Sequence, residues 1–131
     1  MKFILMMQGT QKGWESMSTW SPDDFKAHIE FMHRLNEELT QAGELVAAEG
    51  LDLPVNARIV QARNGDAPAI TDGPFPESKE FLAGFWIVDC ETPQRAAEIA
   101  AKASAAPGRG GEPVNIPIEV RRVMSAPDVE A

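Results

Sequence analysis

A long, well-delimited helix near the start of the chain constrains the fold more than any other feature. Ser21 is a preferred N-cap residue, Pro22 suits the first helical position, and Asp24 stands where a capping box places its acid. Trp20 and Phe25 occupy the two positions of a hydrophobic staple. Apolar residues then recur at helical spacing until a glycine ends the run: Phe25, Ile29, Met32, Leu35 and Leu39, followed by Gly43. The pattern predicts an amphipathic helix that begins after Ser21 and ends before Gly43.

Strand patterns lie on both sides of this helix. Residues 2–8 include apolar residues at both odd and even positions, which is typical of a strand covered on both faces. Residues 9–19 are polar and contain glycine, so we expect a loop there. Residues 44–51 alternate as a strand, and the alternation puts four residues on one side: Leu45, Ala47, Glu49 and Leu51. Glu49 is therefore expected to share a face with apolar neighbours.

The rest of the chain continues in the same manner. The further predicted elements are a strand at 57–63, a short returning strand at 69–71, a buried strand at 81–90, a helix at 94–105 and a final strand at 116–123. Asn64-Gly65-Asp66 is the hairpin signal between the first two, and Thr92 with Pro93 caps the helix. The inner face of that helix carries small residues that allow close packing on a sheet: Ala96, Ile99, Ala100 and Ala103.

This order predicts an α+β fold of the ferredoxin-like βαββαβ type with an extra hairpin arm before the fourth main strand. Both helices then cover one face of the sheet, and the other face needs a cover of its own. A second copy of the chain is the usual cover, so we expect a homodimer through the sheet face.

Length and charge narrow the class of protein. The chain has 131 residues, which suits a single domain at 1–124 with a flexible C-terminal tail at 125–131. A formal net charge of −8 argues against a nucleic-acid partner and against an anionic membrane surface. Cys90 is the single cysteine, no run approaches the ~20 apolar residues of a membrane span, and the N-terminal apolar run is too short for a signal peptide. We therefore expect a cytoplasmic protein.

The most distinctive motif runs from Thr71 to Asp89. Gly73 can adopt a positive φ, while Pro74 and Pro76 fix φ and remove two backbone donors, which predicts a rigid turn before the buried strand. Asp-Gly-Pro-Phe at 72–75, followed by Glu-Ser-Lys-Glu and Gly-Phe-Trp, resembles the YCII-related family that carries the DGPF motif. The resemblance implies a small ferredoxin-like domain of the dimeric α/β-barrel group, and for most members no reaction is established.

His28 and Asp72 are the candidate catalytic residues. His28 falls on the apolar face of the first helix, where a half-buried imidazole can transfer protons; the alternative is a core-edge histidine with one backbone partner. Asp72 is held by the rigid turn and could orient that imidazole, or it could serve only as an Asx-turn acceptor. Some YCII-related members look like enzymes that use a His-Asp pair, and the resemblance carries that pairing onto these two residues.

Four further residues are candidates for substrate binding: Glu49, Lys79, Trp86 and Arg121. Arg121 would suit a substrate carboxylate, and Trp86 could line a pocket for a planar ligand or belong to the core. Lys79, like Glu77, is more simply a member of an ion pair, either solvated or at a dimer interface. A Glu49–Arg121 salt bridge between strands would account for both residues without any ligand.

No metal or cofactor is expected. His28 and His33 are five residues apart, about 140° around a helix, and so cannot chelate one ion together. Cys90 has no cysteine partner, and the Gly108-Arg-Gly-Gly loop lacks the lysine and serine of a phosphate-binding loop.

Three functions from different classes are considered. The first is a small cofactor-free enzyme that uses His28 and Asp72 for acid–base chemistry on a small molecule. The second is a non-catalytic ligand-binding, accessory or sensor homodimer. The third is a dimer that acts through an exposed apolar patch.

Overall fold

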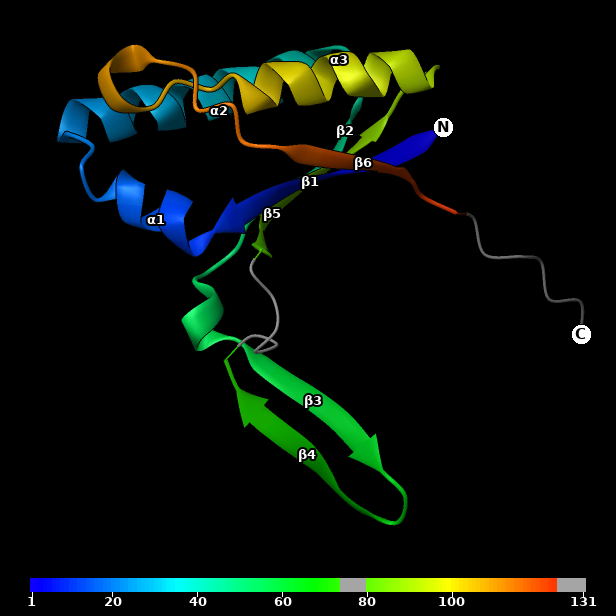
Figure 1. Cartoon of the computed structure of the whole chain (residues 1–131). Coiled ribbons are helices and arrows are strands. Elements are labelled where there is room, and N and C mark those ends of the chain that lie inside the picture. The colour runs from blue at the N-terminus through cyan, green and yellow to red at the C-terminus, as the bar shows by residue number, and fades with distance from the viewer. Residues whose placement is uncertain (74–79, 125–131) are drawn as a thin grey trace, which may run out of the picture.

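Four antiparallel strands and two long helices form the body of the protein (Figure 1). The structure is a computed structural model that describes residues 1–73 and 80–124. Its elements are β1 (Lys2–Thr10), α1 (Gln11–Met17), α2 (Pro22–Gln41), β2 (Leu45–Gly50), the 3-10 turn η1 (Pro54–Asn56), β3 (Arg58–Arg63), β4 (Asp66–Asp72), β5 (Glu80–Asp89), α3 (Pro93–Ser104), the 3-10 turn η2 (Arg109–Gly111) and β6 (Ile118–Arg122).

The main sheet has the strand order β2-β5-β1-β6, and every neighbouring pair is antiparallel. The helix α2 connects β1 to β2 across β5, and α3 connects β5 to β6 across β1, so two split βαβ units interleave. Both helices lie on one face of the sheet (Figure 1). The predicted α+β ferredoxin-like fold is confirmed.

The signals at the start of α2 act as predicted. The Ser21 hydroxyl accepts from the Asp24 backbone N–H at 3.1 Å, and the Asp24 carboxylate accepts from the Ser21 N–H at 2.9 Å. The rings of Trp20 and Phe25 lie 5.1 Å apart as the staple predicts. Gly43 follows the helix with a φ of 73°, a left-handed conformation that favours glycine.

The core lies between the helices and the sheet. The buried residues come from β1, from β5 and the cysteine that follows it, and from both helices: Phe3, Leu5, Leu35, Leu39, Trp86, Val88, Cys90, Ala96, Ile99, Ala100 and Ala103. All four predicted inner-face residues of α3 are among them, which confirms the close packing of that helix. Among the described residues, no helix is both long and apolar enough to cross a membrane.

The opposite face of the sheet carries apolar side chains that no other layer of the described residues covers. Ile4 pairs with Ile87 and Met6 with Phe85 across β1 and β5, and all four side chains are partly exposed. They alternate with the buried Leu5 and Trp86, so they point away from the helices.

The extra hairpin arm consists of β3 and β4, which pair with each other in a separate two-stranded sheet. It projects away from the helices, beyond the N-terminal end of β5 (Figure 1). Val60 and Ile70 face each other across the two strands and are 61% and 59% exposed. A lone two-stranded hairpin is only marginally stable in water.

Two local predictions are wrong. Residues 11–17 form the helix α1 rather than a loop, because Thr10 caps it by accepting from the Gly13 N–H at 3.0 Å. That helix buries no residue, so it leaves no apolar periodicity to detect. The strand β2 shifts register between Leu45 and Ala47, which places Leu45 against Val88 on the core side and Ala47 and Glu49 on the other face.

Several predictions lie outside the described residues. These concern Lys79, Glu77, the Pro-Phe-Pro part of the DGPF turn at 74–76, and the C-terminal tail at 125–131. Gly73, the last described residue before that gap, has a φ of 86°, as expected of the turn glycine.

Candidate functional site

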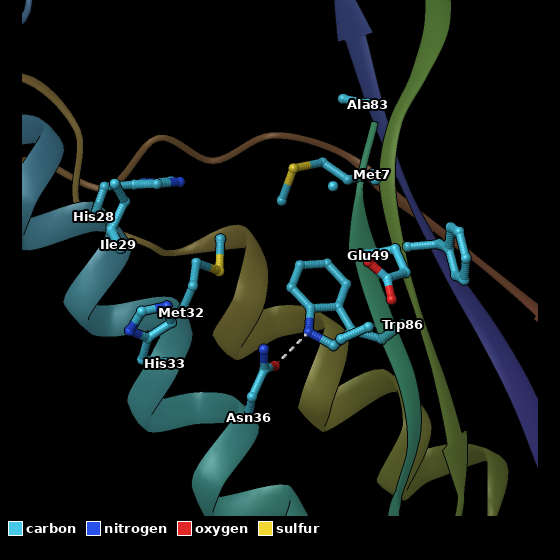
Figure 2. Close-up of a pocket in the computed structure, with 13 residues that line it drawn as sticks. Met7, His28, Ile29, Met32, His33, Asn36, Glu49, Ala83 and Trp86 are labelled. Carbon is cyan, nitrogen blue, oxygen red and sulfur yellow. Dashed lines mark hydrogen bonds between the residues drawn. The ribbon is translucent and has the colours of Figure 1, made fainter. Parts of the chain in front are cut away.

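A cavity of about 460 Å³ opens between α2 and the edge of the sheet formed by β2 and β5 (Figure 2). Its size is within the range of pockets for small organic ligands. It is lined by residues of α2, β1, β2 and β5: Met7, His28, Ile29, Met32, His33, Asn36, Ala48, Glu49, Gly50, Ala83, Gly84, Phe85 and Trp86. Most of these side chains are apolar, and the polar groups stand mainly on α2.

His28 is held in a defined tautomer. Its Nδ1 lies 2.9 Å from the Pro107 carbonyl oxygen, which can only accept, so Nδ1 carries the proton and donates it. The neutral ring then has an unprotonated Nε2 that is free to accept a proton. Nε2 has no hydrogen-bond partner among the described residues. No buried side-chain nitrogen or oxygen of those residues lacks a partner, so Nε2 is not buried but open to the cavity or to solvent.

The loop that supplies the Pro107 carbonyl is fixed to the start of α2. The Asp24 carboxylate accepts from the Gly110 N–H at 3.1 Å while it also caps the helix. The Ser21 N–H, and to a lesser extent the Gly110 N–H, stabilises the charged form and so lowers the pKa of Asp24. The same residues that begin α2 therefore place the carbonyl beside His28.

Close packing of Trp20 completes the support of His28. The two rings are 5.4 Å apart between centroids and tilted by 59°. Gly108 lies against Trp20 so closely that a Cβ at that position would be 2.9 Å from the indole. A glycine is thus needed for the loop to approach the staple and the histidine together.

Trp86 and Asn36 form a second polar pair beside the cavity. The Trp86 indole N–H donates to the Asn36 side-chain oxygen at 2.9 Å (Figure 2). Trp86 is buried and stands on β5, whereas Asn36 is half-buried on α2, so the bond ties the helix to the sheet. The two predicted roles of Trp86, core residue and pocket wall, are both consistent with this position.

Gly84 forms part of the cavity wall between β5 and β2. A Cβ at this position would be 2.9 Å from the Glu49 carbonyl oxygen and 3.4 Å from the Gly50 Cα. Backbone atoms cannot move aside as the end of a flexible side chain can, so the close approach of the two strands depends on this glycine.

The structure brings only part of the predicted site together. His28, Trp86 and Glu49 all line the cavity, Glu49 as an exposed residue on the edge strand β2. Arg121 does not, because it pairs with Ile4 on the face of the sheet away from the helices. The alternative Glu49–Arg121 salt bridge is excluded within one chain, since β2 and β6 form opposite edges about 14 Å apart at ~4.8 Å per strand.

Asp72 stands at the end of β4 on the hairpin arm. Its carboxylate is 90% exposed and lies 3.8 Å from the Arg58 guanidinium across the hairpin. It is not among the residues that line the His28 cavity. Within one chain the structure therefore does not bring the proposed His-Asp pair together.

Sequence reasoning missed three contributors to the cavity. Neither Asn36 nor His33 is among the predicted site residues, and Pro107 carries no sequence signal for its carbonyl contact. A signal for Asn36 did exist, because His28, Met32 and Asn36 follow at intervals of four and so form one row on the helix. Among the described residues, no group of three or more His, Cys, Asp or Glu side chains is placed to hold a metal ion.

An ion pair at the other end of the helices has a structural role. The Arg95 guanidinium on α3 donates to both Glu44 oxygens, at 2.8 and 2.9 Å. This pairing lowers the pKa of Glu44 and raises that of Arg95. The adjacent Cys90 thiol is buried, and burial raises its pKa, so it stays protonated.

Comparison with known proteins places the chain in a family. An uncharacterised protein from Rhizobium meliloti (strain 1021) is 29% identical over 83 residues, which cover 63% of this chain and 66% of that relative, slightly less than two thirds of its length. The family model described as the YCII-related domain matches residues 1–114, which include the cavity and both helices. The chain therefore belongs to the YCII-related domain family.

Proposed function

We propose that this protein binds a small organic molecule in the cavity between α2 and the sheet, and that His28 Nε2 accepts a proton from it. The single observation that carries this proposal is the hydrogen bond from His28 Nδ1 to the Pro107 carbonyl oxygen. It fixes the ring and selects the tautomer in which Nε2 is the basic nitrogen.

The surroundings suit proton transfer at this nitrogen. Met7, Met32 and Trp86 supply apolar walls that limit the water around a bound ligand. A neutral imidazole is a base of suitable strength near neutral pH, and the product imidazolium keeps its Nδ1–H bond to the carbonyl. The reaction class is therefore general base catalysis without a cofactor, such as a lyase, isomerase or hydrolase step.

Asp72 enters this proposal only through a second copy of the chain. The arm that carries it points away from the body of its own chain (Figure 1). A carboxylate from the arm of a second copy would have to reach His28 in order to orient it. The Asp72→Asn variant tests this, because loss of turnover with unchanged ligand binding supports such a role.

The decisive experiment is a thermal-shift screen of a metabolite library, followed by NMR of each binder in D₂O to detect turnover or deuterium incorporation. His28→Gln is the test variant, because its amide can still donate to the Pro107 carbonyl but cannot act as a base. His33→Gln is the matched control in the same cavity. We expect proton exchange or turnover in the wild type and in His33→Gln and its loss in His28→Gln. Equal rates in His28→Gln would refute the assignment.

A second candidate function is ligand binding without catalysis. One observation favours it: the Nδ1 partner of His28 is an uncharged backbone carbonyl, which orients the ring without the charge stabilisation that a carboxylate gives. Ligands that stabilise the wild type and His28→Gln alike, with no turnover in either, would support this function over the first.

We further propose that the protein is a homodimer through the open face of the sheet. The apolar Ile4, Met6, Phe85 and Ile87 on that face support this, as does a hairpin arm with exposed Val60 and Ile70. Light scattering at micromolar concentration should give the dimer mass. Ile87→Lys should give a folded monomer, whereas the matched Ile29→Lys on the helix layer should stay dimeric. A monomeric wild type would contradict the proposal.

A further inference from the structure

Asn36 presents its amide to the cavity in one orientation. The indole N–H of Trp86 can only donate, so the oxygen of the Asn36 amide must face it. The NH₂ group is then directed away from the indole, and Figure 2 shows it pointing along α2 toward Met32. The orientation of this amide is thus set by the tryptophan and does not depend on a ligand.

The Asn36 NH₂ group is a donor without a partner among residues 1–73 and 80–124. Among the hydrogen bonds of the described residues, the Asn36 side chain takes part only through its oxygen. The described part of the chain has no buried side-chain nitrogen or oxygen that lacks a partner, so this nitrogen is not sealed off. Because Asn36 lines the cavity, a ligand there can meet two N–H donors in an otherwise apolar wall.

The charges around the cavity decide which acceptor suits this donor. Of the described residues that line it, none is a lysine or an arginine, and its basic side chains are the two histidines, His28 and His33. The whole chain carries a formal charge of −8. A carboxylate or phosphate at Asn36 would therefore have no lysine or arginine as a counter-charge, whereas a neutral carbonyl oxygen needs none.

We propose that the Asn36 amide donates to a neutral carbonyl oxygen of the ligand, and that the ligand is a flat, mostly apolar, uncharged molecule lying against Trp86. This deepens the proposed function and rests on it, since it concerns the same cavity. Asn36 follows His28 by eight positions, a rise of about 12 Å along α2, so the carbonyl and the proton that His28 accepts lie at opposite ends of the ligand. Asn36 is then a residue that determines specificity rather than a catalytic one.

The experiment uses two probes of the same shape, 2-naphthamide and 2-naphthoate. The full chain labelled with ¹⁵N is titrated with each probe while the side-chain NH₂ signals of Asn36 and the indole signal of Trp86 are followed at neutral pH. Asn36→Asp keeps an acceptor for the Trp86 N–H, removes the two donors and adds one negative charge. Asn64→Asp adds the same charge in the exposed turn of the hairpin arm and is the matched control.

We expect the amide to shift the Asn36 NH₂ signals in the wild type and to bind more tightly than the carboxylate. Asn36→Asp should weaken binding of the amide about tenfold, the effect of one lost hydrogen bond, while Asn64→Asp leaves it unchanged. Three outcomes would overturn the inference: tighter binding of the carboxylate, no shift of the Asn36 signals by the amide, or equal binding of the amide by Asn36→Asp. The wild-type signals decide the matter even if Asn36→Asp fails to fold.

The same titration on His28→Gln separates the two proposals. Binding of the amide that depends on Asn36 and persists in His28→Gln would support the carbonyl site whether or not His28 transfers protons. Binding that is unaffected by Asn36→Asp would remove the carbonyl site and leave the proton-transfer proposal to its own assay.

Discussion

The ion pair between Glu44 and Arg95 offers a prediction whose size and sign both follow from the structure. The carboxylate, just before β2, receives three guanidinium contacts, at 2.8, 2.9 and 3.2 Å. Its side chain is 15% exposed and that of Arg95 is 34% exposed. Arg95 also contacts Glu98, but at 3.4 Å and with that carboxylate 65% exposed. One arginine thus makes a strong and a weak pair side by side.

The expected loss for Glu44→Gln lies between two limits. Exposed pairs contribute ~0.2–1 kcal/mol, and breaking a fully buried pair costs ~3–5 kcal/mol. For this two-pronged, partly buried pair we expect a loss of about 1.5 kcal/mol in the free energy of unfolding at neutral pH. Glu98→Gln should lose less than about 0.5 kcal/mol, because its pair is exposed.

The pH dependence has a definite sign. The pairing lowers the pKa of Glu44 below its ordinary value of 4.5, so its stabilisation is present above that pH. It is lost as the pH falls through the lower pKa of the folded state, because the protonated acid no longer pairs with arginine. The difference between the wild type and Glu44→Gln should therefore shrink on acidification.

The assay is urea unfolding of the wild type, Glu44→Gln and Glu98→Gln at pH 7 and at successively lower pH. All samples need the same protein concentration, because a dimer would make stability depend on it. A loss for Glu44→Gln that equals the loss for Glu98→Gln, or that stays constant with pH, would refute the reasoning.

Two glycine substitutions test the backbone, each by urea unfolding against Gly50→Ala, a position without positive φ where a Cβ meets nothing within 4 Å. Gly73→Ala should cost about 1–2 kcal/mol more than the control, because its φ of 86° strains any other residue even though the space is open. Equal stability of the two would show that the turn can relax. Gly84→Ala should cost about 1–3 kcal/mol more than the control, since its Cβ would press on the Glu49 carbonyl at 2.9 Å. No such loss would show that β2 yields at the cavity wall.

Local signals explain why most elements could be predicted. Ser21 and Asp24 form a capping box from atoms only three residues apart, and Thr92 caps α3 by accepting from the Arg95 N–H at 3.1 Å. Where a local signal stands without an apolar face, as at Thr10 before α1, it was overlooked. The facing of side chains in β2 was predicted wrongly for a different reason. The register of an edge strand is set by its neighbour, here β5, and not by its own alternation.

The candidate site was only partly accessible from the sequence. His28 stands out because a histidine on an apolar helix face is unusual, and the structure places it in the cavity with the Pro107 carbonyl as its partner among the described residues. Asp72 was paired with it on the strength of a rigid turn and a family resemblance. A rigid turn does not determine the direction in which the neighbouring strands project, and the arm that carries Asp72 projects away from α2 (Figure 1).

Caps, turns and periodicity are properties of neighbouring residues, so they are enough to predict the two long helices, the main strands and hence the α+β ferredoxin-like topology. Which side chains share the cavity depends instead on the packing of distant segments. Pro107 meets His28 across 79 positions and Asn36 meets Trp86 across 50, contacts that depend on how α2 lies on the sheet. Such contacts arise from packing of whole layers, which no local pattern encodes.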